Sequence, residues 1–339
     1  EMSKIETPSP GNPPAEDLAP SKVSRVLVKL GYACNNRCSF CHATDNKENP
    51  PLRGDAVVDR LRAARVMGAS MVVFSGGEPT LREELPTFAR LTGQLGMRSG
   101  VVSNGRILSY AKLVDALYDA GLRYAYISLH GSDAVAHDRV VGVPGAHAQA
   151  VQGICNLLAK PDVEVTVNCV VIQDTLPHLR GIPALLRGAS VSAGHGEPRP
   201  YRLKFSFVEP KGRADLDFDR VVPRLSGAAA RALEAMASAR EEMPPGSPEP
   251  AYDGFPPCVM GGRVDLMDDL FTHQIYHMSE AFEAEFYPCD NGARVKPAPC
   301  TSCALSAQCP GVYEGYVARR GASELRPLGP SLEKDTAPA

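Results

Sequence analysis

Between residue 25 and about residue 241, short apolar runs alternate with longer segments of helical periodicity, and no other feature of the sequence restricts the fold as strongly. The apolar runs predict strands at residues 25–32, 70–75, 99–104, 124–130, 163–172 and 202–208. The segments between and after them predict helices near residues 54–67, 81–95, 109–120, 146–159, 176–188 and 221–241. Repeated β–α units of this kind build a parallel sheet that is covered by helices.

The fold class is therefore α/β, and six β–α units favour a partial (β/α)6 barrel of the TIM type. A doubly wound open sheet fits the same periodicity, because both folds consist of strands that alternate with helices. In either fold the loops that follow the carboxyl ends of the strands form the active site.

The rest of the chain surrounds this α/β unit, which we place at residues 23–242. Residues 1–22 are polar and rich in proline, and we expect a disordered lead-in there. A Pro/Gly linker opens a cysteine-rich region at residues 243–325, which has little periodicity and in which metal is expected to replace a hydrophobic core. Residues 326–339 are expected to form a disordered tail.

Charge and cysteine usage exclude several classes of protein. The 339 residues carry 36 Lys and Arg against 39 Asp and Glu, a net charge of −3, which disfavours nucleic acid as the main partner. No apolar run approaches the roughly 18 residues of a transmembrane helix, and no signal peptide is recognisable, so we expect no membrane association. A chain of this length does not need disulfides, so its 10 cysteines favour metal ligation in a reducing compartment, the cytoplasm.

Eight of the cysteines form two groups, whereas Cys155 and Cys169 lie in apolar sequence and are expected in the core. The first group, Cys34, Cys38 and Cys41, directly follows the first predicted strand. Three thiolates at this spacing can bind three irons of a cubane cluster and leave the fourth iron open, as a catalytic metal requires. A zinc ion is the alternative, but it needs a fourth ligand, and the adjacent residue His42 rarely reaches the same metal.

The segment Cys34-x3-Cys38-x-Phe40-Cys41 resembles the signature of the radical SAM superfamily, in which an aromatic residue precedes the last cysteine. Ser75-Gly76-Gly77-Glu78-Pro79 resembles the GGEP element of that family. Ser103-Asn104 ends the third predicted strand, Ser128 lies at the end of the fourth and Asn168 lies in the fifth, in the order that the family shows. The resemblance covers residues 25–210 and implies a [4Fe–4S] cluster and S-adenosylmethionine (SAM) as cofactors.

The same resemblance implies roles for individual residues. Gly76, Gly77 and Glu78 would bind the SAM amino group, which suits residues that let backbone approach a ligand edge-on and that place a carboxylate beside a cationic amine. The other residues expected around SAM are Ser103, Asn104 and Ser128 at the ribose and carboxylate, Phe40 and Val170 at the adenine, and Asn168. Enzymes of the family cleave SAM reductively to a 5′-deoxyadenosyl radical, which abstracts a hydrogen atom from the substrate.

The second group consists of Cys258, Cys289, Cys300, Cys303 and Cys309. Cys300-x2-Cys303-x5-Cys309 resembles the auxiliary-cluster regions called SPASM and twitch, although no further cysteine follows within the expected few residues. We therefore expect one auxiliary [4Fe–4S] cluster, hence two clusters in all, with Cys258 as fourth ligand and Cys289 as its contender. Zinc is the alternative, because four thiolates also close a zinc site. A Cys289 thiol outside the cluster would be a candidate donor of a hydrogen atom to a substrate radical.

The resemblance implies an enzyme of the oxidoreductase or peptide-modifying type. SPASM-like regions favour a maturase that cross-links, epimerises or oxidises a ribosomally synthesised peptide. Only about 24 residues precede the first strand, too few for a leader-binding winged-helix module, so we expect a separate leader-peptide-binding protein or a small-molecule substrate such as a sugar or an amino acid. Flavodoxin or ferredoxin is the expected electron donor. The alternative from another class is a non-catalytic Fe–S or zinc-stabilised binding protein.

Weaker candidates lie near the ends of two strands. His130 and His137 follow the fourth strand, where we expect loop histidines to be solvated. Lys204 and Glu209 lie on and after the sixth strand and could reach the mouth of the barrel.

Overall fold

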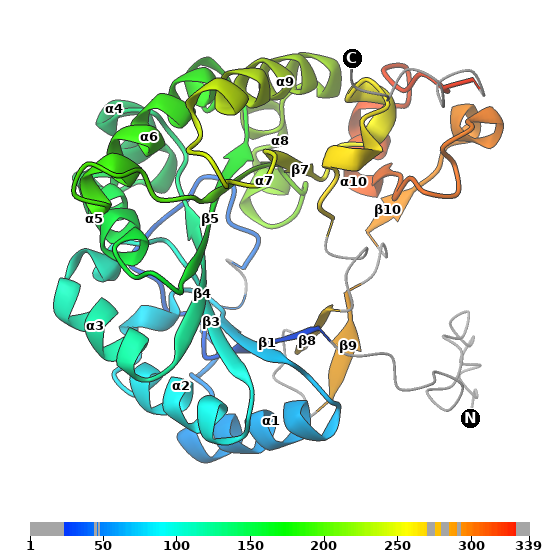
Figure 1. Ribbon diagram of the computed structural model, residues 1–339. Coiled ribbons are helices and arrows are strands. Elements are labelled where there is room, and N and C mark those ends of the chain that lie inside the picture. The colour runs from blue at the N-terminus through cyan, green and yellow to red at the C-terminus, as the bar shows by residue number, and fades with distance from the viewer. Residues whose placement is uncertain are drawn as a thin grey trace, which may run out of the picture.

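The computed structural model describes residues 24–43, 46, 48–269, 275–278, 285–289 and 293–329. Its main feature is a curved sheet in the order β7-β6-β5-β4-β3-β2-β1-β8-β9, with helices on its outer side (Figure 1). The strands from β1 to β6 follow one another in chain order without a reversal, and a doubly wound sheet would reverse. The prediction of a partial TIM-like barrel is therefore confirmed, and the doubly wound alternative is wrong.

Six parallel strands form the centre of the barrel, and all six predicted strands are present. They are β1 (Arg25–Lys29), β2 (Met71–Ser75), β3 (Arg98–Ser103), β4 (Leu122–Ser128), β5 (Glu164–Val171) and β6 (Arg202–Phe207). Most residues of β2 and β5 are buried, as expected for strands that are covered on both faces.

The predicted helices are also present, with shifted ends. The longer ones are α1 (Gly54–Val66), α2 (Leu85–Gln94), α3 (Ala111–Asp119), α5 (Ala146–Leu158), α6 (Ile182–Ala193) and α9 (Leu225–Glu242). Each turns an apolar stripe to the sheet; in α3 the stripe includes the buried Val114 and Leu117. None of the helices within the described residues has the length and apolar character that a membrane crossing requires.

One helix was not predicted. Residues Ala134–Val141 form α4, so His137 lies on a helix and not in a loop. The Asp133 side chain caps its start by accepting the Ala136 N–H at 2.9 Å, and Gly142 ends it with φ 68°. Three short helices, α7 (Arg213–Leu216), α8 (Phe218–Val221) and α10 (Glu314–Arg320), complete the set in the described residues.

The cysteine-rich region contributes strands to the barrel, so the boundary predicted at residue 243 does not coincide with the edge of the sheet. β7 (Ala251–Asp253) pairs with β6, and β8 (Ile275–Met278) pairs with β1. β9 (Phe286–Pro288) runs antiparallel to β8, whereas β10 (Arg294–Val295) and β11 (Val312–Tyr313) form a separate ribbon. Short strands of three or four residues give too little pattern to be predicted.

The predicted termini need one correction. Residues 1–22 and 330–339 lie outside the described residues, but residues 326–329, which were assigned to the tail, lie against the cysteine-rich region. The Leu328 carbonyl accepts the Ala304 N–H at 2.8 Å, and the Leu328 N–H donates to the Cys303 sulfur at 3.4 Å. These two hydrogen bonds, one to a backbone group and one to a thiol, tie the segment to the cysteine-rich region.

Candidate active site

The first cysteine group lies in the loop that leaves the carboxyl end of β1. The thiols of Cys34, Cys38 and Cys41 are half-buried. The Cys34 sulfur accepts the backbone N–H of Asn36 at 3.4 Å and the side-chain N–H of Asn104 at 3.8 Å. Such hydrogen bonds favour the thiolate, which is the form that binds iron.

Contacts from two distant parts of the chain fasten this loop. The Arg37 N–H donates to the Val141 carbonyl at 2.8 Å, and the Ser39 N–H donates to the Val140 carbonyl at 3.0 Å, both at the end of α4. Arg213, at the start of α7, donates from its guanidinium to the Arg37 carbonyl at 3.0 Å. The positions of the cysteines are therefore set by the surrounding backbone.

The two glycines that follow β2 lie directly against this loop. The Gly77 N–H donates to the Gly31 carbonyl at 2.8 Å. A Cβ atom on Gly77 would lie 2.4 Å from the carbonyl oxygens of Tyr32 and Ala33, and one on Gly76, which has φ 123°, would lie 2.2 Å from the Gly31 oxygen. We expected the glycines to admit a ligand; the structure shows that they are needed first to admit the chain's own cysteine loop.

Glu78 joins the ends of β2 and β3. Its carboxylate is 3% exposed and accepts the Thr80 N–H (3.1 Å), the Thr80 hydroxyl (2.6 Å), the Ser103 hydroxyl (2.8 Å) and the Asn104 N–H (2.7 Å). Burial raises the pKa of Glu78, while these hydrogen bonds oppose the rise. These four bonds hold the carboxylate in place at the ends of β2 and β3, and the expected contact of Glu78 with a ligand amine stays a prediction.

Asn104 and Arg106 connect β3 to the cysteine loop. The Asn104 amide donates to the Asn35 side chain at 2.7 Å, and the Arg106 guanidinium donates to the Asn35 carbonyl at 2.5 Å and to the Asn36 side chain at 3.1 Å. Arg106 was not among the predicted site residues. Arg106 lies two positions after Asn104, in Ser103-Asn104-Gly105-Arg106, and this proximity to a predicted site residue is the sequence signal that could have identified it.

Phe40 and Val170, both expected at the adenine, meet the same histidine. The Phe40 ring lies edge-on to His130 with centroids 5.0 Å apart, and the Val170 N–H donates to His130 Nδ1 at 3.2 Å. His130 is 2% exposed and stacks on His137, which is 1% exposed, so the expectation that these histidines are solvated is wrong. Burial lowers the pKa of His130 to about 3 and that of His137 to about 4, and both side chains are neutral at pH 7.

Ser128 and Asn168 are neighbours across β4 and β5 at the carboxyl end of the sheet. The Asn168 side chain is 6% exposed and accepts the Ser206 hydroxyl of β6 at 2.8 Å. Ser128 is half-buried. The site residues on β2 to β6 thus gather at one end of the barrel, which is where parallel α/β folds place their active sites.

The second cysteine group separates into four residues that meet and one that does not. Cys258, Cys300, Cys303 and Cys309 line one pocket together with Lys296. Cys289 follows β9 and donates its backbone N–H to the Ile275 carbonyl of β8, at the other edge of the sheet from β7. Of the two contenders for a fourth ligand, the structure therefore brings Cys258 to the other three.

The four thiols affect one another electrostatically. Burial, followed by the proximity of other cysteines in this set, raises the pKa of Cys300, whereas Lys296 lowers it. The Cys309 sulfur accepts the Gly311 N–H at 3.3 Å, which favours a thiolate there. Half-buried thiols that repel each other as thiolates are stabilised when cationic metal binds them.

Both groups fit an iron–sulfur cluster by their donor chemistry, since each consists of half-buried thiols with N–H groups directed at sulfur. Within the described part of the chain, no three Cys, His, Asp or Glu side chains are grouped as ligands of a single metal ion. In a cubane each thiolate binds its own iron. Cys169 is fully buried and Cys155 is half-buried; the expectation of a core residue is confirmed for Cys169.

Comparison with known proteins shows what the first part of the chain is similar to. Residues 28–179 match the model of the radical SAM superfamily. PqqA peptide cyclase of Rhodopseudomonas palustris is 33% identical over 157 residues, which cover 44% of this chain and 40% of that protein. AdoMet-dependent heme synthase of Oleidesulfovibrio alaskensis is 30% identical over 174 residues, which cover 50% of this chain and 44% of that protein. The matched segment thus spans less than half the length of these relatives.

A solved structure matches over a longer range. Streptococcus suis SuiB bound to S-adenosylmethionine superimposes with a TM-score of 0.63 over 89% of this chain and 76% of that chain, at 13% sequence identity. At this identity the match shows a common fold. The matched range extends beyond the α/β unit into the cysteine-rich region.

Proposed function

We propose that residues 28–179, which match the radical SAM model, form a radical SAM domain, and that the chain is an enzyme which cleaves SAM reductively and abstracts a hydrogen atom from its substrate. The observation that carries this proposal is the loop of Cys34, Cys38 and Cys41, which is held against Gly76-Gly77 and bonded by Asn104. When bound there, the cluster and SAM supply the 5′-deoxyadenosyl radical. The protein supplies orientation and the exclusion of water.

We assign the cofactor contacts to residues of this chain. Cys34, Cys38 and Cys41 hold the first [4Fe–4S] cluster, and the N–H groups of Asn36 and Asn104 stabilise its sulfur ligand. The residues proposed to hold SAM are Gly76 and Gly77 through their backbone, Glu78, Ser103, Asn104, Ser128 and Asn168 through polar groups, and Phe40 and Val170 at the adenine. The side chains of Ser103, Asn104 and Asn168 are already hydrogen-bonded within the protein, so they would hold a ligand in a preformed geometry.

We assign a second [4Fe–4S] cluster to Cys258, Cys300, Cys303 and Cys309. The common pocket and the electrostatic coupling of these thiols support this set over one that includes Cys289. With four protein ligands the cluster would be closed, which suits electron transfer better than direct catalysis. Cys289 then stays a candidate hydrogen donor, and a Cys289→Ala variant with unchanged product formation would remove it from that role.

A peptide is the substrate class that we favour. A sequence relative is a peptide cyclase, and SuiB has also been solved with its precursor peptide SuiA, with a TM-score of 0.61 to this chain. A small molecule is the second candidate, because another relative is a heme synthase. Flavodoxin or ferredoxin as electron donor, and a separate leader-peptide-binding protein, complete the proposal.

The test measures iron, acid-labile sulfide and 5′-deoxyadenosine after anaerobic reconstitution and addition of dithionite and SAM. We expect about eight irons per chain in the wild type and about four in a Cys34/Cys38/Cys41→Ala variant, with 5′-deoxyadenosine lost only in the variant. Cys155→Ala is the matched control, because Cys155 lies outside both groups and should keep iron and activity. A fully loaded wild type that forms no 5′-deoxyadenosine contradicts the proposal.

A further inference from the structure

A cavity of about 670 Å³ lies on the inner face of the barrel. Its lining includes Ser75 at the end of β2 and Val102 near the end of β3. Ser75 precedes Gly76 in sequence, and Val102 precedes Ser103, and both of these neighbours belong to the candidate active site. Pockets of about 300–1,000 Å³ are typical for small ligands and side chains. A substrate group in this cavity would therefore lie close to the proposed SAM site.

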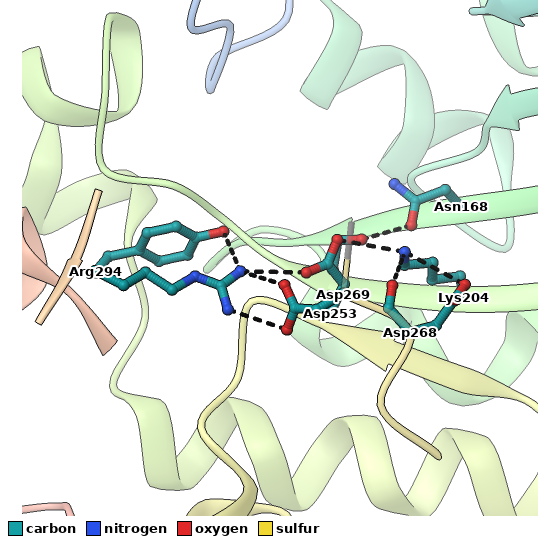
Figure 2. A network of polar contacts seen from close by, with 8 residues as sticks. Asn168, Lys204, Asp253, Asp268, Asp269 and Arg294 are labelled. Atoms are coloured by element: carbon teal, nitrogen blue, oxygen red, sulfur yellow. Dashed lines mark hydrogen bonds and ion pairs between the residues drawn. The ribbon is translucent and has the colours of Figure 1, made fainter. Parts of the chain in front are cut away.

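One wall of the cavity is charged. Lys204, on β6, is an ion-pair partner of Asp253 at 3.3 Å and of Asp268 at 3.5 Å, and it donates to the Asp268 carbonyl at 2.5 Å (Figure 2). All three residues line the cavity. An ammonium group has three N–H donors, and these three contacts engage all of them.

The exposed fractions of these side chains decide which charged groups a ligand could reach. The Lys204 side chain is 2% exposed, whereas the Asp253 and Asp268 side chains are 17% and 24% exposed. The two aspartate side chains are therefore more accessible than the lysine side chain between them. A carboxylate has about four acceptor positions, so the wall presents acceptors to a ligand.

Arg294 and Asp269 form a second group of charged residues, which holds Asp253 in position. The Arg294 guanidinium of β10 binds Asp269 at 2.6 and 3.0 Å and Asp253 at 3.3 Å, and it also donates to the Tyr313 hydroxyl at 3.3 Å (Figure 2). Burial, together with the neighbouring Asp253, raises the pKa of Asp269 to about 7, while Arg294 opposes the rise. Arg294 thus holds Asp253 and Asp269 in place.

Another part of the cavity lining is aromatic. Tyr124 and Tyr126 of β4 line it, and the Arg25 guanidinium already lies over the Tyr124 ring at 4.6 Å. Aromatic faces and carboxylates are the two kinds of group that recognise an organic cation. Both occur in this cavity.

We propose that the cavity binds a cationic side chain of the substrate, an ammonium or guanidinium group, through Asp253 and Asp268. This inference rests on the proposed function, because it names the substrate class of that site. It selects substrates that carry lysine-like or arginine-like groups, from a peptide or from a small amine. Lys204 and Arg294 position the carboxylates and do not contact the ligand.

The test compares Nα-acetyl-lysine amide with Nα-acetyl-norleucine amide, which lacks only the ammonium group, and with n-butylamine. Binding to the reconstituted full-length protein with SAM is measured by titration calorimetry. We expect the lysine amide to bind at least about ten-fold more tightly than the norleucine amide, as a charge-assisted hydrogen bond requires. Binding of n-butylamine alone would point to a small amine, and its absence beside lysine-amide binding would point to a peptide.

Asp253→Asn should remove most of this ten-fold preference and leave norleucine binding unchanged. Asp162→Asn is the matched control, because Asp162 lines the same cavity at the amino ends of the strands and should keep the preference. Asp268→Asn is the second test variant if Asp253→Asn unfolds. A cation beside Asp253 lowers the pKa of Asp269, so the wild type should also release protons on binding near pH 7, seen as a buffer-dependent enthalpy.

Three results would overturn the inference: equal affinity for the two amides, no binding of either amide or of n-butylamine, or the same loss of preference in Asp162→Asn as in Asp253→Asn. The proposed function is tested separately, by measuring the formation of 5′-deoxyadenosine. Loaded protein that forms 5′-deoxyadenosine but has no cation preference contradicts only the inference. Protein that prefers the cation but forms none contradicts only the function.

Discussion

Replacing Gly77 by alanine tests how the glycine pair and the cysteine loop depend on each other. The new Cβ would lie 2.4 Å from two carbonyl oxygens of the loop, those of Tyr32 and Ala33, where contacts below 3.0 Å force a displacement. Both obstacles are backbone atoms and cannot rotate away. Overpacking of this kind destabilises by about 1–3 kcal/mol, and loss of the hydrogen bond from Gly77 to Gly31 would add about 0.5–1.5 kcal/mol.

The assay is the melting temperature and the iron content of the anaerobically reconstituted variant. Gly77→Ala is expected to melt below the wild type and to lose iron from the first cluster, because the displaced loop carries its three cysteines. Gly93→Ala is the matched control: Gly93 lies in α2 with no atom within 4 Å of an added Cβ, and alanine there should stabilise by about 0.5–1 kcal/mol. Equal melting temperatures and iron contents in the two variants would refute the reasoning.

Three further predictions concern other parts of the molecule. Cys258→Ser should lose about four irons while Cys289→Ser keeps them, and iron analysis showing the reverse would exchange their assignments. The pKa values of His130 and His137 lie at about 3 and about 4, against 6.5 in the unfolded chain. The unfolded chain therefore binds protons first, and the melting temperature should fall as pH drops from 6.5 toward 4. A melting temperature that stays constant over that range contradicts the burial of these neutral rings. Lys204→Met removes the buried cation from Asp268 and leaves Asp253 with Arg294 alone, and it should destabilise by about 3–5 kcal/mol, measured by thermal unfolding. A loss of no more than about 1 kcal/mol, as for an exposed pair, would show that the network does not depend on Lys204.

The sequence predicted the central barrel because its six strands are long enough to show an apolar pattern. The prediction failed where elements are short or where polar capping residues define a helix. α4 begins at Asp133 and ends at Gly142, and these two caps were visible in a segment that was instead interpreted as a loop. β7 and β8 have three and four residues, and only their pairing with β6 and β1 defines them.

The candidate site was predicted residue by residue from motifs, yet the surroundings of two of its residues were not. The carboxylate of Glu78, which is expected beside a ligand amine, also accepts hydrogen bonds from the ends of β2 and β3. His130 was expected in solvent, but it is buried between Phe40 and His137. Neither arrangement follows from local sequence, because the partners lie on strands and loops that meet only in the folded barrel.

The cavity wall illustrates the same limit. Lys204 was a weak candidate in the sequence, and its partners Asp253 and Asp268 lie 49 and 64 residues further along the chain. Arg294 reaches the same network from the cysteine-rich region. A network assembled from such distant segments has no sequence motif, so its contribution to the site could be recognised only in the structure.

The most direct test of the central claim is the electron paramagnetic resonance spectrum of the reduced, fully loaded protein before and after addition of SAM. If the loop of Cys34, Cys38 and Cys41 holds a cluster with an open iron, SAM will bind that iron and change the signal of this cluster, while the signal of the second cluster stays the same. The change should be absent in the Cys34/Cys38/Cys41→Ala variant. A wild-type spectrum with two cluster signals that SAM leaves unchanged would contradict the account.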